Sequence, residues 1–360
     1  MPNFNGGGAE RALINFANAL LQEGMTVFFF VGKAKGPRKN DLNKNIHLVI
    51  LNKPKIVLAA YTLSKHLKSN KVEVLISTLL NANVCNILAT KLFSPKTRAI
   101  IREASVPSQA SLNRKSKLLV RLAKFLFKHA DSAIAVSKEV RKDFIDFYGV
   151  PSNKVHIVYN HSGKVRPKKK PRHPFYTENY TEKRIVAVGR ITPVKNFSLL
   201  VDAFYEVSRH IDSTLVILGQ KELNPAETKK VEDKIKSLGI DDRVDLPGFE
   251  KYPEDYVHHS DVLVLSSNYE GFPNVIILSL MCGTPVVATD CSGGIREILD
   301  HGNYGLLTPP GSITEMSSAI LQQLRKPFPS TESIRKRSSF FSKEKSTATL
   351  KNLIENHLDN

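Results

Sequence analysis

The chain has 360 residues, 41% of them apolar and 24% charged, which is typical of a globular protein long enough to form two domains. Its three cysteines show no paired spacing, so we expect reduced thiols and a cytoplasmic protein rather than a disulfide framework. The opening residues carry no basic segment followed by an apolar one, and no apolar run approaches the ~20 residues that span a bilayer. These features exclude a secreted disulfide scaffold and predict no membrane-spanning helix.

The net charge of +18 is concentrated in the first half of the chain. Residues 1–160 hold 25 Lys and Arg against 9 Asp and Glu, whereas residues 174–360 carry a net charge of −4. Such asymmetry indicates a polyanionic surface nearby, either anionic lipid or nucleic acid, with a merely solubilising charge as the third alternative. The basic half has no recognisable nucleic-acid-binding motif with interleaved aromatic residues, so we expect no nucleic acid and favour a membrane surface.

Short apolar runs rich in β-branched residues alternate with longer helical segments along the chain. The predicted strands are 27–31, 46–51, 72–77, 99–101, 132–136 and 155–158, then 185–188, 214–218, 262–266, 285–288 and 305–307. Helical periodicity marks 197–211, 226–238 and 313–324. Strands without strict polar alternation, each followed by a helix, favour parallel sheets covered on both faces. The predicted class is α/β.

The predicted organisation is two facing Rossmann-like domains, at 1–160 and 175–340. A Pro-, Lys- and Arg-rich linker at 161–174 separates them, and a closing helix follows at 341–360. The first domain opens on a glycine loop that runs directly into a helix, although a Rossmann-like domain ordinarily begins with a central strand. Either the domain lacks that strand or the start lies inside a longer reading frame. We favour the second.

Three glycines, Gly6, Gly7 and Gly8, precede a helix whose apolar stripe starts at Ala9. Backbone without Cβ atoms at a helix N-terminus suits an anion, although a simple glycine turn is the alternative.

Two segments in the second half of the chain follow predicted buried strands. In parallel sheets, ligands bind just outside these carboxyl ends of the strands. Arg190 and Lys195 follow the strand 185–188 and suit a diphosphate. Glu270 follows the strand 262–266, beside a helix predicted to begin near Asn274. We expect amides there to hold phosphate and the carboxylate to hold sugar hydroxyls.

The stretches GGGAERALINFANAL, AVSKEVRKDFIDFYGV, VHIVYN, VGRITPVKNFSLLVDAF and SNYEGFPNV through CSGGIREIL resemble the retaining, GT-B-fold glycosyltransferases of family 4. These enzymes build cell-envelope polysaccharides and lipid-linked glycans. The resemblance implies that Arg190 and Lys195 bind the donor diphosphate, and that Glu270 contacts the donor sugar. The amides of Gly271, Phe272, Pro273 and Asn274 would lie beside it, and Gly6–Gly8 would close on the phosphates from the other domain.

Two positions depart from the family pattern. A second Glu usually follows the first after seven residues and holds the ribose hydroxyls, but Leu278 stands there. Losing such a bond costs roughly 1.5–3 kcal/mol, or about 10–150-fold in donor affinity. If the donor geometry is otherwise kept, Leu278→Glu should lower the donor KM. Many members also carry a His near the position of Ala104.

The segment Leu112 to Ala130 predicts a basic amphipathic helix. One side carries Leu118, Leu122, Phe125 and Leu126, and an adjacent stripe carries Lys117, Arg121, Lys124 and Lys128. Contact with an anionic membrane and packing of the leucine side on the sheet are both compatible with this pattern.

The sequence therefore predicts a retaining hexosyltransferase that moves a sugar from a nucleotide-diphosphate donor to a lipid-linked or polysaccharide acceptor, at the inner face of the membrane. No cluster of metal-binding residues is visible, so we expect no required metal and no cofactor besides the donor substrate. The alternative is a non-catalytic homologue that binds a glycan or a protein partner, which Leu278 favours. Donor turnover separates the two.

Overall fold

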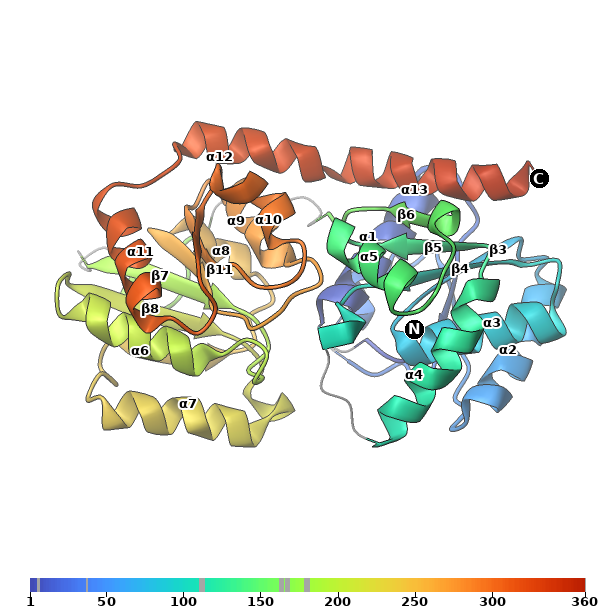
Figure 1. Cartoon of the computed structure of the whole chain (residues 1–360), viewed down its shortest axis with the longest axis horizontal. Coiled ribbons are helices and arrows are strands. Elements are labelled where there is room, and N and C mark those ends of the chain that lie inside the picture. Colours follow the sequence, from blue (N-terminus) through green and yellow to red (C-terminus); the bar gives the residue numbers. More distant parts are fainter. Residues whose placement is uncertain are drawn as a thin grey trace. The chain divides into compact units, whose positions relative to one another are not determined.

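A computed structural model describes residues 1–4, 7–36, 38–109, 114–161, 165, 169–177 and 182–359 (Figure 1). Contacts divide the chain into two compact units. Unit 1 comprises Met1–Gly163 together with Ser342–Asn360, and unit 2 comprises Lys164–Phe341. Much of the predicted linker, and Asn5 and Gly6 of the glycine loop, lie outside the described residues.

Unit 2 is built on one parallel sheet of six strands in the order β12-β11-β10-β7-β8-β9. The strands are β7 (Lys183–Val188), β8 (Ser213–Leu218), β9 (Val244–Gly248), β10 (Val262–Leu265), β11 (Val286–Thr289) and β12 (Leu306–Thr308). Its helices are α6 (Phe197–Ser208), α7 (Pro225–Ser237), α8 (Pro253–His258), α9 (Asn274–Cys282), α10 (Ile295–Ile298), α11 (Ile313–Arg325) and α12 (Thr331–Ser338). The chain winds outward in both directions from the central pair β7 and β10, as a doubly wound domain does.

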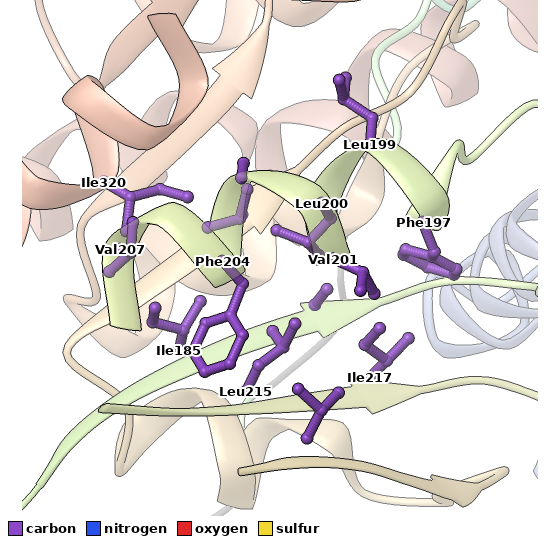
Figure 2. Close-up of a cluster of buried hydrophobic side chains, with 14 of the residues drawn as sticks. Ile185, Phe197, Leu199, Leu200, Val201, Phe204, Val207, Leu215, Ile217 and Ile320 are labelled. Carbon is purple, nitrogen blue, oxygen red and sulfur yellow. The ribbon is translucent and has the colours of Figure 1, made fainter. Parts of the chain in front are cut away.

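The core of unit 2 lies between α6 and the strands β7 and β8. Figure 2 shows Phe204 pointing from α6 toward Ile185 of β7 and Leu215 of β8, and all three side chains are fully buried. Ile320 of α11 joins the same cluster beside Val207. Because both sheet faces are covered, the strands read as nearly continuous apolar runs. This packing fixes the ends of β7 and β10, from which the loops of the candidate site extend.

Unit 1 is also parallel α/β, but its strands form two separate sheets. β1 (Phe28–Val31) pairs with β2 (His47–Ile50), and β3 (Val74–Thr78), β4 (Arg98–Glu103), β5 (Ser132–Ala135) and β6 (Val155–Ile157) form the second sheet in that order. The helices are α1 (Gly8–Gln22), α2 (Ile56–Ser69), α3 (Leu80–Leu88), α4 (Arg114–Leu126), α5 (Lys138–Asp146) and α13 (Lys343–Leu358). In Figure 1, α13 lies on one side of the strands of this unit and α2 and α3 on the other.

The terminal helix α13 packs on unit 1 rather than on the residues that precede it in sequence. Ser132 Oγ and His357 Nε2 are 2.8 Å apart, and Lys351 Nζ lies 3.1 Å from Glu23 Oε2 at the end of α1. Leu350 and Ile354 join Phe16 and Leu20 of α1 in one apolar cluster. The last helix therefore completes the first unit of the chain.

The α/β class agrees with the sequence prediction, as do eleven of the twelve strands in the described part of the chain, with ends shifted by up to two residues. β9 was missed because it contains Pro247 and Gly248, which are unusual in strands. The structure explains both, since β9 is at the edge of the sheet, where proline is tolerated. Within the described part of the chain, no helix is both long and apolar enough to cross a membrane.

The face of α4 that packs is not the leucine side expected from the helical wheel. Val120, Ala123 and Phe127 are buried. Leu118 and Phe125 are 69% and 62% exposed, and Leu122 is exposed as well. The alternative in which the leucine side packs on the sheet is therefore wrong.

Candidate active site

The predicted site residues of unit 2 lie in the loops that follow β7 and β10 and on helix α9. Strands β7 and β10 are neighbours, and the chain order diverges on either side of them. In open parallel sheets the crevice at this switch point, outside the carboxyl ends of the strands, is where ligands bind. The fold therefore brings Lys195 and Glu270, 75 residues apart in sequence, to one place.

Hydrogen bonds join the loop after β7 to the loop after β10. Ser266 Oγ donates to the carbonyl of Lys195 at 2.8 Å, and the amide of Asn268 donates to the carbonyl of Val194 at 2.8 Å. Asn268 Nδ2 also donates to the carbonyl of Pro193 at 3.0 Å. Neither loop continues the hydrogen-bond ladder of the sheet. These bonds therefore hold the two loops together beyond the ends of β7 and β10.

Lys195 and Glu270 form the central contact of the site. Lys195 Nζ donates to Glu270 Oε1 at 2.5 Å, and Ser267 Oγ donates to the same oxygen at 2.7 Å. The side chains of Lys195 and Glu270 are 17% and 12% exposed, so water screens their attraction only partly. The carboxylate is thus held in one orientation at the mouth of the sheet, with a cation against it.

A third loop, after β11, supports the backbone that carries Glu270. The amide of Glu270 donates to the carbonyl of Ser292 at 2.8 Å, and the amide of Gly294 donates to the carbonyl of Gly271 at 2.9 Å. Gly293 has a φ of +123°, and a Cβ there would lie 1.9 Å from the carbonyl oxygen of Glu270. Only glycine fits such a contact. No role was predicted for Gly293 and Gly294 from the sequence, although two adjacent glycines in the loop after a predicted strand were a usable signal.

Arg190 occupies the same loop as Lys195 but differs in its surroundings. It is exposed, and among the described residues its guanidinium makes no hydrogen bond or ion pair. Gly189 lies close to the Lys195 side chain, since a Cβ on Gly189 would approach Lys195 Cε to 3.0 Å. In the loop after β7, Lys195 is therefore paired with Glu270, whereas Arg190 is exposed and can bind an anionic ligand.

Helix α9 begins at Asn274, as predicted, with Pro273 as its N-cap. Phe272 is 5% exposed and its ring packs edge to face on Phe341, with centroids 5.6 Å apart. This ring fixes the entry of the chain into the helix and belongs to the core. The Phe272 ring is therefore not available to a ligand, whereas backbone groups and the positive end of the helix dipole at Gly271–Asn274 are suited to an anion.

Leu278 lies on α9 as a packing residue. Its side chain is 4% exposed, and Ile276, Ile277 and Leu280 around it are fully buried. The helix is apolar on nearly every side, as a helix enclosed by protein is. The position in which the family carries its second Glu is thus buried on this helix.

Cys291 lies beside the site but is not a reactive thiolate. It is 7% exposed, and burial, aided by the nearby Glu270 carboxylate, raises the pKa of its thiol to about 12. A thiol with such a pKa stays protonated near neutrality and is a poor nucleophile.

In unit 1, Gly8 begins α1 and Gly7 is its N-cap. A Cβ on Gly7 would lie 2.3 Å from Glu10 Oε2, so the Glu10 carboxylate lies over this helix end. This carboxylate occupies the place where the sequence predicted a bound anion. The position of Ala104 follows Glu103, whose carboxyl is buried at the end of β4 and whose pKa burial raises to about 7.

Two family models match the chain and together cover most of it. "Glycosyltransferase Family 4" matches residues 6–161, and "Glycosyl transferases group 1" matches residues 168–339. The chain is 30% identical over 239 residues to a Campylobacter jejuni protein, covering 66% of this chain and 63% of that protein. That relative is named N-acetylgalactosamine-N,N'-diacetylbacillosaminyl-diphospho-undecaprenol 4-alpha-N-acetylgalactosaminyltransferase. The amylovoran biosynthesis glycosyltransferase AmsD of Erwinia amylovora is 24% identical, with 83% of this chain and 82% of AmsD covered.

Solved structures show the same fold over the whole chain. HepE of Anabaena, solved in complex with UDP-glucose, has a TM-score of 0.85 at 20% identity, covering 99% of this chain and 98% of HepE. Sucrose-phosphate synthase of Thermosynechococcus elongatus has a TM-score of 0.84 at 18% identity, covering 100% of this chain and 96% of that enzyme. The two parallel α/β units and these matches confirm the predicted GT-B fold. The chain therefore belongs to the family 4-like glycosyltransferases of the GT-B fold.

Proposed function

We propose that this glycosyltransferase moves a hexose from a nucleoside diphosphate donor to a lipid-linked or polysaccharide acceptor, with retention of anomeric configuration. The observation that carries the proposal is the Lys195–Glu270 pair, 2.5 Å apart at the switch point of unit 2, with Arg190 exposed in the same loop. HepE was solved with UDP-glucose, and the C. jejuni relative is named for a diphospho-undecaprenol acceptor, which supports both substrate classes.

The pair suits an exchange of partners when the donor binds. The donor diphosphate would compete with Glu270 for Lys195, and Arg190 would add a planar, bidentate contact. Glu270, still held by Ser267, would then accept hydrogen bonds from hydroxyls of the donor sugar. Lys195 and Glu270 thus bind each other in the structure. When the donor separates them, Lys195 can bind the diphosphate and Glu270 can bind the sugar.

In the proposed reaction, the bond between the anomeric carbon and the phosphate oxygen breaks while the acceptor oxygen bonds to the same face of that carbon. The acceptor hydroxyl proton passes to the departing phosphate oxygen, so the groups balance. Arg190, Lys195 and the amide end of α9 stabilise the charge that develops on the diphosphate. Cys291 stays a thiol, so we route no covalent intermediate through it.

The test is release of nucleoside diphosphate from a panel of UDP- and GDP-sugars, with membrane lipid extract as acceptor. Glu270→Ala should lower turnover at least about a hundredfold, equivalent to ~2.7 kcal/mol, with the fold retained. Glu332→Ala, at an exposed acid on α12, is the matched control and should leave turnover unchanged. Near wild-type turnover in the Glu270 variant would remove Glu270 from the site, and an inverted anomeric product would contradict retention.

The alternative function is a non-catalytic homologue that binds a glycan or a partner protein. The buried leucine at position 278 favours it, because the usual ribose contact is missing there. Failure of the wild-type protein to release diphosphate from every donor, while it still binds a donor or a glycan, would establish this alternative.

We also propose that unit 1 contacts an anionic membrane through α4. The lipid-facing surface consists of exposed apolar and basic side chains: Leu118, Leu122, Phe125, Lys117, Arg121, Lys124 and Lys128. Apolar side chains flanked by lysines are typical of helices that lie in the interface of a bilayer. Lys128 Nζ lies 5.5 Å from the centre of the Phe125 ring, so the two kinds of side chain are adjacent.

Reversing the four cations of α4 to Glu should abolish pelleting with anionic liposomes, because each contributes about 1 kcal/mol near such a surface. A matched control reverses four exposed cations of unit 2, namely Lys229, Lys230, Lys236 and Lys326, and should leave pelleting intact. Equal loss in both variants would indicate a response to net charge, and unaltered pelleting in the α4 variant would exclude this helix as the lipid contact.

A further inference from the structure

Helix α2 carries large apolar side chains on its solvent-facing side as well as on its buried side. Leu63 and Leu67 are buried, whereas Val57 is 62% exposed and Tyr61 is 50% exposed. A helix at the surface of a globular protein ordinarily keeps its outer side polar. An apolar outer side is expected where a second surface contacts the helix.

The turn η2 (Ala89–Phe93) extends this apolar surface beyond α2. The rings of Tyr61 and Phe93 are in edge contact, with centroids 5.7 Å apart, and Leu92 next to Phe93 is 66% exposed. Single exposed apolar residues are normal, but a group of them marks a binding surface. The group consists of Val57, Leu58, Tyr61 and Leu92, and we call it the α2 face.

Lysines surround the α2 face. Lys53 and Lys55 precede the helix, and Lys65 and Lys68 continue its exposed side beyond Tyr61. Lys65 Nζ lies 4.6 Å from the centre of the Tyr61 ring. Within the described residues, none of these four lysines forms an ion pair. Such side chains can cover apolar surface with their stems and keep their ammonium groups in water.

The sequence around the α2 face is almost without acids. Residues 42–130, which include α2, η2 and α4, hold 16 Lys and Arg against two acids, Glu73 and Glu103, and Glu103 is buried. A positive surface of this extent complements an anionic one. Aliphatic side chains flanked by cations are typical of contact with the interface of a bilayer.

Helices α2 and α4 belong to one layer of unit 1. Helix α3 packs against both of them. Figure 1 shows α2 and α3 on the same side of the strands, and a right-handed crossover from β4 to β5, the normal hand for parallel strands, puts α4 there too. The outer side of this layer therefore carries the α2 face together with the exposed side chains of α4, namely Leu118, Leu122 and Phe125.

We propose that the α2 face is a second lipid contact, so that this helical layer lies flat on an anionic bilayer. The inference rests on the proposed membrane contact through α4. The aliphatic side chains of the α2 face would enter the acyl boundary, while Tyr61 and the lysines would lie at the headgroups. Because the helices of the layer run alongside the strands, the strands would then be parallel to the membrane plane. Contact through α4 alone would leave the α2 face in water.

The experiment places one fluorophore at each surface. The chain contains no tryptophan, so a single introduced indole reports only its own surroundings. Tyr61→Trp places it in the α2 face, Leu122→Trp in α4, and Leu223→Trp at an exposed leucine of unit 2 as the matched control. With vesicles of phosphatidylglycerol and phosphatidylcholine, the first two emissions should shift to shorter wavelength and be quenched by brominated acyl chains. The Leu223→Trp emission should not change.

The outcomes separate the second contact from the proposed contact through α4. A shift for Leu122→Trp but not for Tyr61→Trp would overturn the second contact and leave the α4 contact standing. No shift for either variant would contradict both lipid contacts. A shift for all three variants would indicate adsorption without a preferred orientation and would overturn the flat arrangement.

A pair of double variants tests whether the apolar side chains of the α2 face contribute to affinity. Leu58→Ser with Leu92→Ser removes two of them without changing the charge, and should lower partitioning onto the same vesicles at least about tenfold. The control, Leu223→Ser with Ile313→Ser in unit 2, should leave partitioning unchanged. All four side chains are exposed, so both variants should fold, which thermal melts verify. Equal partitioning by the two double variants would refute the second contact.

Discussion

Replacing Leu278 with Glu tests whether this residue packs the core or faces the donor. The side chain is 4% exposed on a helix whose neighbouring residues are buried, so the new carboxyl would be withdrawn from water. Losing a buried leucine costs about 1.5–3 kcal/mol, and burying a polar group without a hydrogen bond costs about 1–3 kcal/mol more. We therefore expect the Leu278→Glu variant to lose roughly 3–6 kcal/mol of unfolding free energy.

The assay pairs thermal melts with donor titrations. For a domain of this size, each kcal/mol lowers Tm by about 2–4 °C, so the Tm should fall by roughly 6–24 °C. Leu278→Met conserves volume and should cost less than about 1.5 kcal/mol. Leu278→Gln introduces a side chain of nearly the same shape as Glu that cannot ionise. The two variants therefore differ only in whether the side chain at position 278 titrates.

The pH dependence of the stability of the Leu278→Glu variant gives a second, independent test of burial at this position. Burial raises the pKa of a carboxyl above its ordinary value of about 4.3, so the folded Glu variant holds its proton more tightly than the unfolded chain. Its stability relative to the Gln variant is greatest below about pH 4 and falls as pH rises through the folded pKa. An unchanged Tm together with a lower donor KM would refute the packing argument and place residue 278 at the ribose.

Three further predictions address other parts of the chain. Gly293→Ala should lower turnover at least tenfold, because its Cβ would lie 1.9 Å from the Glu270 carbonyl, whereas Gly311→Ala, at a φ of +81° in open space, should leave turnover unchanged. Glu103 is buried with its pKa raised to about 7, so its stabilising effect is complete below about pH 4.5 and is lost by about pH 7. Urea unfolding should therefore show Glu103→Gln gaining about 3 kcal/mol relative to wild type across that range. Diphosphate release should persist after treatment with EDTA, and loss that only added Mg²⁺ or Mn²⁺ restores would contradict the metal-free reaction.

For several site contacts, the sequence predicted which residues lie near one another but not which side chains touch. Placing Lys195 and Glu270 after two buried strands predicted that they lie at the same edge of a sheet. That they touch, with Ser267 as a third partner, depends on β7 and β10 being adjacent, which no local pattern encodes. Gly293 was overlooked for the same reason, since its need for no Cβ comes from the Glu270 carbonyl in a different loop.

The residues by themselves determined the α/β class, most of the strands and the loops that follow them, because alternating apolar runs and helical periodicity are local properties of the chain. Tertiary structure decided which side of α4 is buried, since its wheel carries two apolar stripes and only packing against neighbouring elements selects Val120, Ala123 and Phe127. It also decided that Leu278 is buried and that β7 and β10 are adjacent. Burial and strand adjacency are set by residues distant in sequence, which is why no local pattern predicts them.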